Sequence, residues 1–288
     1  MKNMVLRIVS ILALFITVSC TGKDEVKTIV LDDKATYTKG LALLEDGLCS
    51  SNKHMIGIRD LSALPSDDDP EFKPKPSAQE GFKLIAEAHK RGYQDASFIY
   101  AKAMEVGILI EEDYPASIEL YRKLANAGHV LSQYELGQQL MYGRLTKDRF
   151  LLKRTGTSVQ TDVEAFSWFL KAAENGYPFA QNSVAVCLQR GSGTERNPTA
   201  SFKWAKLSAY AGYVGGQETV GIHYINGDGV PQDLDMANAW FKIAADSPNN
   251  SMAKIYAGKI AEYVNQKRSA ALEMQLREEL KTTTKLRK

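Results

Sequence analysis

A serine between two glycines is the nearest the sequence comes to a catalytic nucleophile. A nucleophile elbow places its serine on a sharp turn from a strand into a helix, but no strand pattern precedes Arg190-Gly191-Ser192-Gly193. The residues on both sides have helical spacing, and no second glycine stands at the distance that the elbow requires. We therefore interpret this segment as a turn between two helices.

Metal binding and acid–base catalysis find no support in the spacing of the other candidate residues. The segment Gly227-Asp228-Gly229, followed by Asp233 and Asp235, lacks the ligand spacing of a calcium loop, and Asp233 stands where a carboxylate can cap a helix. No His-Glu-x-x-His motif occurs. The histidines occupy unrelated positions: His54, His89, His129 and His223. We expect no enzymatic activity, no metal and no cofactor.

The N-terminal segment places Cys20 in a position with a specific chemical role. It follows an apolar run, residues 8–18, that is preceded by basic residues and is too short to cross a membrane, which takes about 20 residues. The sequence Val18-Ser19-Cys20 resembles the lipobox of bacterial lipoproteins, which implies lipidation of Cys20. Ordinary secretory cleavage nearby is the alternative. Thr21 after the cysteine implies sorting to the outer membrane.

The rest of the chain is organised by a fixed period. Trp168, Trp204 and Trp240 follow one another at intervals of 36 residues. Two sets of glycines repeat around them: the mid-unit glycines Gly107, Gly143, Gly191 and Gly227, and the closing glycines Gly92, Gly128, Gly176 and Gly212. Self-similarity at a period of this size predicts a stack of supersecondary units rather than one globular core.

Each unit is predicted to be a pair of helices. In the first half, Ala180, Val184 and Leu188 share one helical stripe, and the mid-unit glycine ends the helix because it adopts the left-handed conformation at little cost. In the second half, Ala237 and Trp240 share a face with alanines one turn later. We assign a structural core role to Trp168, Trp204, Trp240, Gly143, Gly191 and Gly227.

One unit carries a recognisable consensus. It contains Gly221-x-x-Tyr224-x-x-Gly227-x-Gly229-Val230-x-x-Asp233, then Ala237-x-x-Trp240 and Ala244-Ala245. This pattern resembles the Sel1-like repeat, a relative of the tetratricopeptide repeat. Other units depart from it, with Leu120 in place of tryptophan and Met104, Leu140 and Leu188 in place of tyrosine. The resemblance implies an all-α fold: a right-handed α-solenoid of about five αα-hairpin repeats with a C-terminal capping helix.

The organisation that follows has four parts: a lipoprotein signal peptide at 1–20, a tether at 21–34, the repeat array at 35–250, and capping helices with a basic tail at 251–288. Residues 251–276 keep helical spacing through Ile255, Ile260, Ala271 and Leu272, and we expect this stripe to seal the last repeat, with a polar outer face. Two insertions interrupt the period, near 48–73 and 144–159. Both enter at the turn inside a unit, so we expect them on the same edge of the solenoid.

The second insertion is the candidate partner-binding surface. Its basic and apolar residues are Arg144, Lys147, Arg149, Phe150, Lys153 and Arg154. Apolar side chains flanked by arginine suit a protein contact. The alternative, left open, is a solvated loop whose apolar residues fold back on the array.

Composition restricts the partners. The 288 residues carry a formal net charge of +2, which gives no electrostatic footprint for nucleic acid. Cys49 and Cys187 lie in distant units, so free thiols are expected, with Cys187 in a core position.

Sel1-repeat lipoproteins of this size resemble immunity proteins that inhibit type VI secreted phospholipases. One expectation is therefore a lipid-anchored periplasmic protein, at the inner leaflet of the outer membrane, that binds a secreted lipase effector. The other is an envelope adaptor or scaffold for resident proteins.

Overall fold

The structure, a computed structural model, describes residues 32–48, 74–107, 109–142, 159–247 and 250–286. Within these ranges the chain forms twelve α-helices and no strand, so the predicted all-α solenoid of helix pairs is confirmed. The helices are α2 (Asp33–Leu48), α3 (Pro76–Lys90), α4 (Gln94–Val106), α5 (Tyr114–Asn126), α6 (Val130–Tyr142), α7 (Val159–Glu174), α8 (Pro178–Arg190), α9 (Pro198–Tyr210), α10 (Val214–Asn226), α11 (Leu234–Ala244), α12 (Ser251–Ile260) and α13 (Gln266–Leu286).

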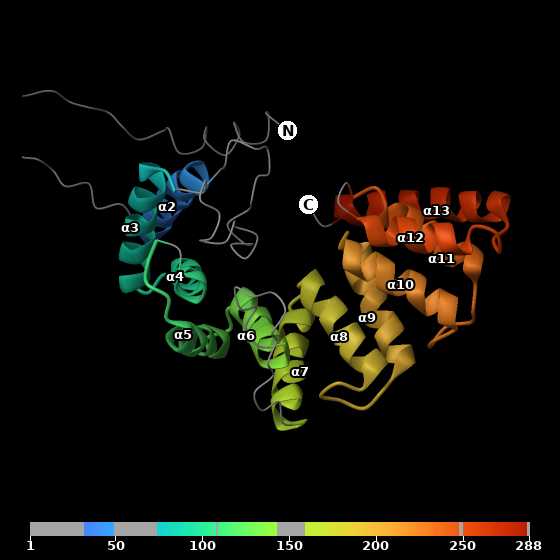
Figure 1. The fold of residues 1–288 in the computed structure, drawn as a ribbon, viewed down its shortest axis with the longest axis horizontal. Coiled ribbons are helices and arrows are strands. Elements are labelled where there is room, and N and C mark those ends of the chain that lie inside the picture. Colours follow the sequence, from blue (N-terminus) through green and yellow to red (C-terminus); the bar gives the residue numbers. More distant parts are fainter. Residues whose placement is uncertain (1–31, 49–73, 108, 143–158, 248–249, 287–288) are drawn as a thin grey trace, which may run out of the picture. The chain divides into compact units, whose positions relative to one another are not determined.

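Consecutive helices pair into five αα-hairpins, as Figure 1 shows along the chain: α2 with α3, α4 with α5, α6 with α7, α8 with α9, and α10 with α11. Each hairpin also contacts the next one, because its second helix packs against the first helix that follows. The last hairpin is covered by α12 and α13, both of which pack against α11. Helices α2 to α13 belong to one unit, Asp33–Lys288.

The turn inside a hairpin is fixed by a glycine and a capping side chain. The mid-unit glycines Gly107, Gly191 and Gly227 end their helices in the left-handed conformation, with φ between 70° and 74°. The second helix then begins at a side chain that accepts a backbone N–H three residues on, at 3.0 Å in each case: Asp113, Asn197 and Asp233. The predicted cap at Asp233 is therefore confirmed.

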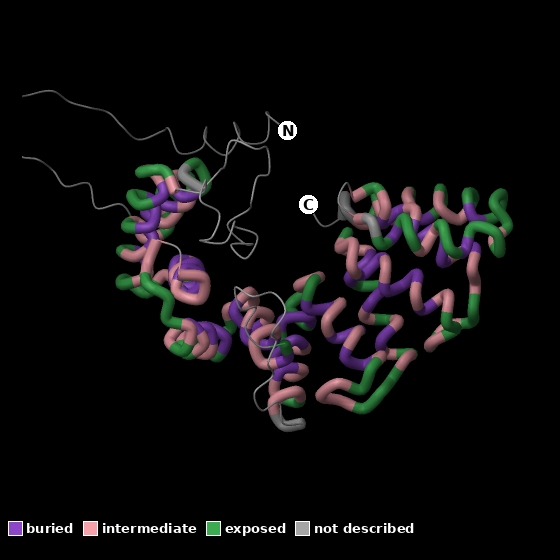
Figure 2. The backbone as a smooth tube through the Cα atoms, in the orientation of Figure 1, coloured by how far each residue is buried: buried purple, intermediate pink, exposed green. Residues whose placement is uncertain are grey.

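Close packing inside a hairpin depends on matching small residues with large ones. A methyl group built on Gly137 would lie 2.7 Å from the ring of Phe169, and one on Gly221 would lie 2.8 Å from Phe241. Alanine at either position would force a ring to move. Figure 2 shows the buried residues along the sides where helices meet and the exposed residues at turns and on the outer side of α13.

The C-terminal helices differ in part from the expectation. Ile260 is buried and Leu272 packs on the core, but Ile255 is 47% exposed and Ala271 is also exposed, so the predicted packing of these two residues was wrong. Helix α13 instead meets α11 through a stripe that includes Ser269 and Leu276, both buried. The sequence spacing alone fits more than one stripe, and α11 selects the stripe that faces it.

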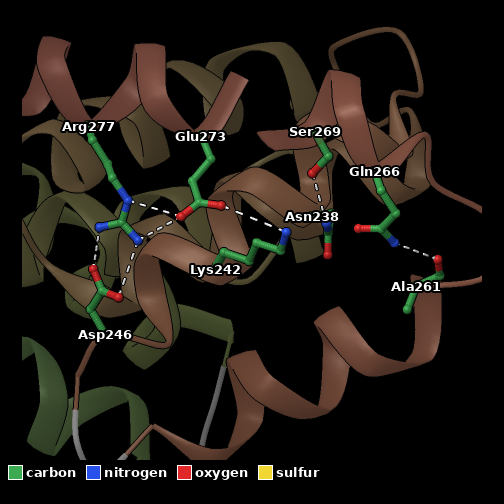
Figure 3. A network of polar contacts seen from close by, with 8 residues as sticks. All are labelled: Asn238, Lys242, Asp246, Ala261, Gln266, Ser269, Glu273 and Arg277. Carbon is green, nitrogen blue, oxygen red and sulfur yellow. Dashed lines mark hydrogen bonds and ion pairs between the residues drawn. The ribbon is translucent and has the colours of Figure 1, made fainter. Parts of the chain in front are cut away.

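A series of polar contacts holds α13 along α11 (Figure 3). Asn238 donates a hydrogen bond to Ser269 at 2.8 Å, and both side chains are buried. Arg277 donates to Asp246 and Glu273, and Glu273 lies 3.8 Å from the ammonium of Lys242. At the other end of the contact, Arg268 pairs with Asp233 and Asp235 of the α11 N-terminus. We call this set of contacts the α13 latch.

Candidate functional site

An aromatic or imidazole ring follows every closing glycine. These residues, Tyr93, His129, Tyr177 and Tyr213, stand directly before α4, α6, α8 and α10. Each closing glycine has φ between 81° and 90°, and the N–H of the residue after it bonds to a carbonyl five residues earlier, at 3.0–3.2 Å. The same turn therefore delivers a ring to the same place in four consecutive repeats.

Two of these tyrosines belong to a continuous group of rings that spans three repeats. Tyr177 stacks on Phe179 with ring centroids 5.3 Å apart, and Phe179 lies 4.3 Å from Tyr213. Tyr134 of α6 meets Tyr177 edge-on at 5.2 Å. We call Tyr134, Tyr177, Phe179 and Tyr213 the aromatic row. Phe179 is 41% exposed, although it lies between two other rings.

Gly215 makes the contact between Tyr213 and Phe179 possible. A methyl group on Gly215 would lie 2.7 Å from Cε1 of Tyr213 and 3.0 Å from its hydroxyl, so the ring rests against the bare backbone of the first turn of α10. Gly215 lies inside a helix and has no positive φ, so the backbone itself would accept alanine. The glycine therefore serves the position of the tyrosine ring rather than the path of the chain.

Two carboxylates act on hydroxyls of the aromatic row. Burial raises the pKa of the Tyr213 hydroxyl, and the Glu218 carboxylate raises it further. Burial also raises the pKa of Tyr134, with a smaller contribution in the same direction from Glu135. The row thus carries neutral hydroxyls and lies beside two carboxylates.

Glu135 also belongs to a buried cluster of charges between α4, α5 and α6. The Lys102 ammonium lies 2.8 Å from Glu135 and 3.2 Å from Glu105, and the Tyr121 hydroxyl donates to Glu105 at 2.8 Å. Burial lowers the pKa of Lys102, but the two glutamates together outweigh it and raise the pKa overall. One ammonium and two carboxylates leave one negative charge. At the positions of α10 that correspond to Lys102 and Glu105 the chain has Ile222 and Ile225, so the cluster is not a general feature of the repeat.

The arrangement closest to a nucleophile and a base is Ser201 with His223. The Ser201 hydroxyl lies 2.9 Å from Nε2 of His223, and Nδ1 of the same ring lies 2.6 Å from the Asp228 carbonyl. Both side chains are fully buried, so no substrate reaches them. Burial lowers the pKa of His223 despite the Asp228 carbonyl, which acts in the opposite direction. The pair joins α9 to α10 and is structural.

The tryptophans, two of the mid-unit glycines and Cys187, all singled out from the sequence, lie within the described residues. Trp168 and Trp240 are buried, at 6% and 1% exposure, whereas Trp204 is only half-buried between two core clusters. Gly191 and Gly227 end α8 and α10. Cys187 is buried, and burial raises the pKa of its thiol to about 12, so it is an inert core residue.

The remaining candidates lie outside the described residues. These are Cys20, Cys49, Gly143 and the predicted partner-binding residues Arg144, Lys147, Arg149, Phe150, Lys153 and Arg154. Gly191-Ser192-Gly193, by contrast, is described and forms the turn between α8 and α9. Across the described ranges, acidic residues, histidines and cysteines form no group of three that could hold a metal ion. Within the same ranges, no helix has the length and apolar character needed to cross a bilayer.

The aromatic row was missed by the sequence reasoning, although part of its signal was available. The ring after each closing glycine has the same period as the glycines themselves. Phe179 has no aromatic equivalent in the other repeats, whereas Phe98 stands at the position of Tyr134 and meets the ring of His129 at 5.4 Å. The packing of neighbouring first helices brings Phe179 and Tyr134 together in one group.

The chain belongs to the Sel1 repeat family. Matches to this repeat cover residues 94–129, 130–177, 178–213 and 217–249, more than half of the chain, and correspond to the hairpins from α4 to α11. The second match is longer than its neighbours and contains the segment between α6 and α7. The α2–α3 hairpin lies outside the matches. Repeats of this family indicate a scaffold for protein–protein interaction.

Two solved structures share the fold. One is a protective antigen present in uropathogenic Escherichia coli strains that displays an SLR fold, with a TM-score of 0.65 and 21% identity over 88% of this chain. This chain spans about half the length of that protein, 48%. The other is a Sel1 repeat protein from Oxalobacter formigenes, with a TM-score of 0.55 and 22% identity over 68% of this chain and 76% of that one. At these identities the likeness extends to the fold alone.

Proposed function

We propose that this protein works by binding another protein, without chemistry of its own, and that the aromatic row is part of the surface that makes the contact. The observation that carries the proposal is the exposed Phe179 ring, held between Tyr177 and Tyr213. Aromatic side chains with fixed positions are the residues that contribute most to protein interfaces, because they bury a large area at a small entropic cost.

The particular function we propose is that of an immunity protein that inhibits a type VI secreted phospholipase. The N-terminal pattern that ends in Cys20 supports a lipid anchor and a periplasmic position, at the inner leaflet of the outer membrane. A stoichiometric inhibitor of this kind needs a broad binding surface near the membrane that it protects, and a repeat array supplies such a surface. The basic segment from Arg144 to Arg154 is proposed as a second contact region.

The first test is capture of the partner. The full-length protein, with a C-terminal tag, is used as bait against periplasmic and secreted fractions, and the eluate is identified by mass spectrometry. We expect one secreted lipase, whose activity the protein abolishes at equimolar ratio. Recovery of resident envelope proteins, with no lipase and no inhibition, would establish the adaptor role and end the immunity proposal.

The same complex tests the basic segment. Replacing Arg149 and Arg154 with glutamate should weaken binding, because both substitutions reverse a charge at the proposed contact. Circular dichroism of the variant should match that of the unchanged protein. Unchanged affinity would remove the segment from the binding surface.

A further inference from the structure

We infer that α12 binds a helix of the protein partner that presents an aromatic side chain at its start and a carboxylate six residues later. The surface is the side of α12 formed by Met252, Ile255 and Lys259, which we call the α12 face. This inference adds a surface other than the aromatic row, and it rests on the proposed function only in taking the partner to be a protein.

Helix α12 takes the place of a further first helix in the array. It packs on α11, the second helix before it, as α6, α8 and α10 pack on α5, α7 and α9. Its third residue, Ala253, is small and fully buried, as are Ala96 and Ala180, the third residues of α4 and α8. Equivalent positions in these helices can therefore be found by counting from the first residue of each helix.

Two positions of a first helix meet the ring that stands directly before the next first helix. Phe179 is the second residue of α8, and its ring centroid lies 4.3 Å from that of Tyr213. Tyr134 is the fifth residue of α6, and its ring centroid lies 5.2 Å from that of Tyr177. The second and fifth positions therefore face the next first helix.

The ninth position also faces the next first helix, and in α4 it carries a charge. Lys102 is the ninth residue of α4, and its ammonium lies 2.8 Å from the carboxylate of Glu135, the sixth residue of α6. Helix α12 again has a lysine at this position, Lys259. The first helices between them have uncharged residues there: Gln138, Val186 and Ile222.

On α12 these three positions are exposed. Met252 is 51% exposed and Ile255 is 47% exposed, and Lys259 is also exposed. The chain after α12 does not cover them, because α13 packs along α11. Among the described residues Lys259 forms no ion pair, and its ammonium lies 6.0 Å from the ring centroid of Tyr256. The α12 face thus has the residues of a contact between first helices without the helix that would complete it.

A carboxylate of the chain itself does not take the place of the missing one. Lys102 pairs at 3.2 Å with Glu105, three residues further along α4. Glu262 stands three residues after Lys259, but it lies beyond the end of α12 and the two form no ion pair. The Lys259 ammonium is therefore left for a carboxylate from outside.

The partner's features follow from how the chain fills the same positions elsewhere. A ring at the start of an incoming helix would cover Met252 and Ile255, as the rings before α8 and α10 meet the fifth and second positions. A carboxylate six residues later would reach Lys259, as Glu135 reaches Lys102. The apolar contact supplies most of the affinity, and the ion pair selects an acidic helix in one register.

The test uses as its probe a fluorescent helical peptide of about 16 residues, long enough to form a helix on an alanine–glutamine framework. It carries tyrosine at its first position and glutamate at its seventh, and circular dichroism verifies its helicity. The matched control peptide has the same composition, with the glutamate moved two positions along, to another side of the helix. Titrated into the full-length protein and followed by anisotropy, the control should bind about 5-fold more weakly or less.

Two variants of the protein test the α12 face directly. Lys259→Glu and Met252→Ala should each weaken the probe by roughly 5- to 10-fold. A probe with lysine in place of its glutamate should bind Lys259→Glu better than it binds the unchanged protein. Such a reversal requires contact with the side chain at position 259, because a loss of structure in α12 would weaken both probes.

Matched controls are available next to the α12 face. Lys254 is exposed on another side of α12, and Met274 is 70% exposed on α13. Lys254→Glu and Met274→Ala therefore change the same residue types outside the face, and both should bind the probe as the unchanged protein does. Equal losses in the controls and in the α12-face variants, or no reversal in Lys259→Glu, would overturn the inference.

Two further measurements decide between this inference and its rivals. Sedimentation equilibrium that shows self-association, lost in Lys259→Glu, would assign the α12 face to a second copy and overturn the inference. If the captured partner binds both α12-face variants as tightly as the unchanged protein, the inference fails and the proposed function stands. If the probe behaves as expected but no partner is captured, the α12 face stands and the proposed function fails.

Discussion

Gly193 and Gly229 lie where the turn of one hairpin touches the second helix of the hairpin before it. A methyl group on Gly229 would lie 2.6 Å from the amide nitrogen of Thr199 and even closer to the Pro198 carbonyl. One on Gly193 would meet the backbone of Asp162 and Val163 in the same way. Backbone thus rests on backbone between hairpins, and this contact explains why the second glycine of each Gly-x-Gly turn is a glycine.

The loss of unfolding free energy caused by disrupting this contact can be measured by comparing alanine substitutions at two glycines. Gly212 and Gly229 both have positive φ, at 85° and 72°, but nothing lies within 4 Å of a methyl group on Gly212. Gly212→Ala should therefore cost only the strain of the left-handed conformation, roughly 1–2 kcal/mol. Gly229→Ala should cost about a further 1–3 kcal/mol because the backbone must shift.

Urea unfolding of the two variants gives the loss of unfolding free energy caused by each substitution. The comparison holds only if the denaturant dependence of the unfolding free energy is the same in both, since a change would indicate loss of one hairpin alone. Equal destabilisation by the two substitutions would mean that the approach of Gly229 to α9 does not set the spacing.

Leu109 shows that the turn conformation persists without the second glycine. It stands two residues after Gly107, as Gly193 does after Gly191, and has φ of 66°. It is the one non-glycine residue with positive φ in the described ranges. Its side chain packs against the core cluster of the first repeats, which offsets the strain.

At the scale of helices, α13 has a different status from the hairpins. It covers Trp240 and Ile243 with Leu276, and its latch satisfies Asn238 of α11. Ion pairs that are exposed contribute little, so the larger part of its effect comes from the apolar contact and from the buried Asn238–Ser269 bond. The α13 latch therefore fixes where the helix lies, while burial determines how firmly it is held.

Removing α13 should loosen the end of the array and not its beginning. With a chain that stops after Asn265, we expect faster amide hydrogen exchange in α10 and α11, because repeat proteins lose stability locally. Exchange in α4 to α6 should stay as it is. A second chain that stops after Leu280 keeps the latch and serves as the control. Uniform acceleration across all helices would show that the array unfolds as one cooperative unit.

What the sequence could predict follows from how local each feature is. The hairpins were predictable because glycine turns and caps such as Asp233 repeat with the period. The burial of Ile260 followed from helical spacing. The predicted packing of Ile255 was wrong because helical spacing alone does not say which stripe of a terminal helix faces a neighbouring helix. The Lys102 cluster and the aromatic row depend on contacts between repeats, and Lys102 reads in the sequence as an ordinary surface lysine.

For the whole molecule, histidine burial predicts a stability that depends on pH. The pKa values of His89, His129 and His223 are all lowered from the ordinary value of 6.5, with burial as the largest cause. The unfolded chain therefore binds protons at a pH where the folded chain does not. Stability should be full above pH 6.5 and should fall as the pH drops below it towards the folded pKa values.

A second loss should follow at lower pH. Arginine partners hold the pKa of Asp233 and Asp246 below the ordinary value of 3.8, so their contribution is present above that value and lost as the pH falls through the folded pKa. Urea midpoints measured between about pH 7 and pH 3 should show both steps. His129→Gln should reduce the upper step and leave the lower one, and an upper step of unchanged size would assign it to other groups.

The backbone-to-backbone contact between hairpins affects how such an array can evolve. The spacing of the stack depends at Gly193 and Gly229 on backbone atoms that every residue has, whereas the proposed binding surface consists of side chains at the start of the first helices. Mutations that exchange one partner for another need not alter the pitch. The protein can thus adopt a new specificity while its own assembly is inherited unchanged.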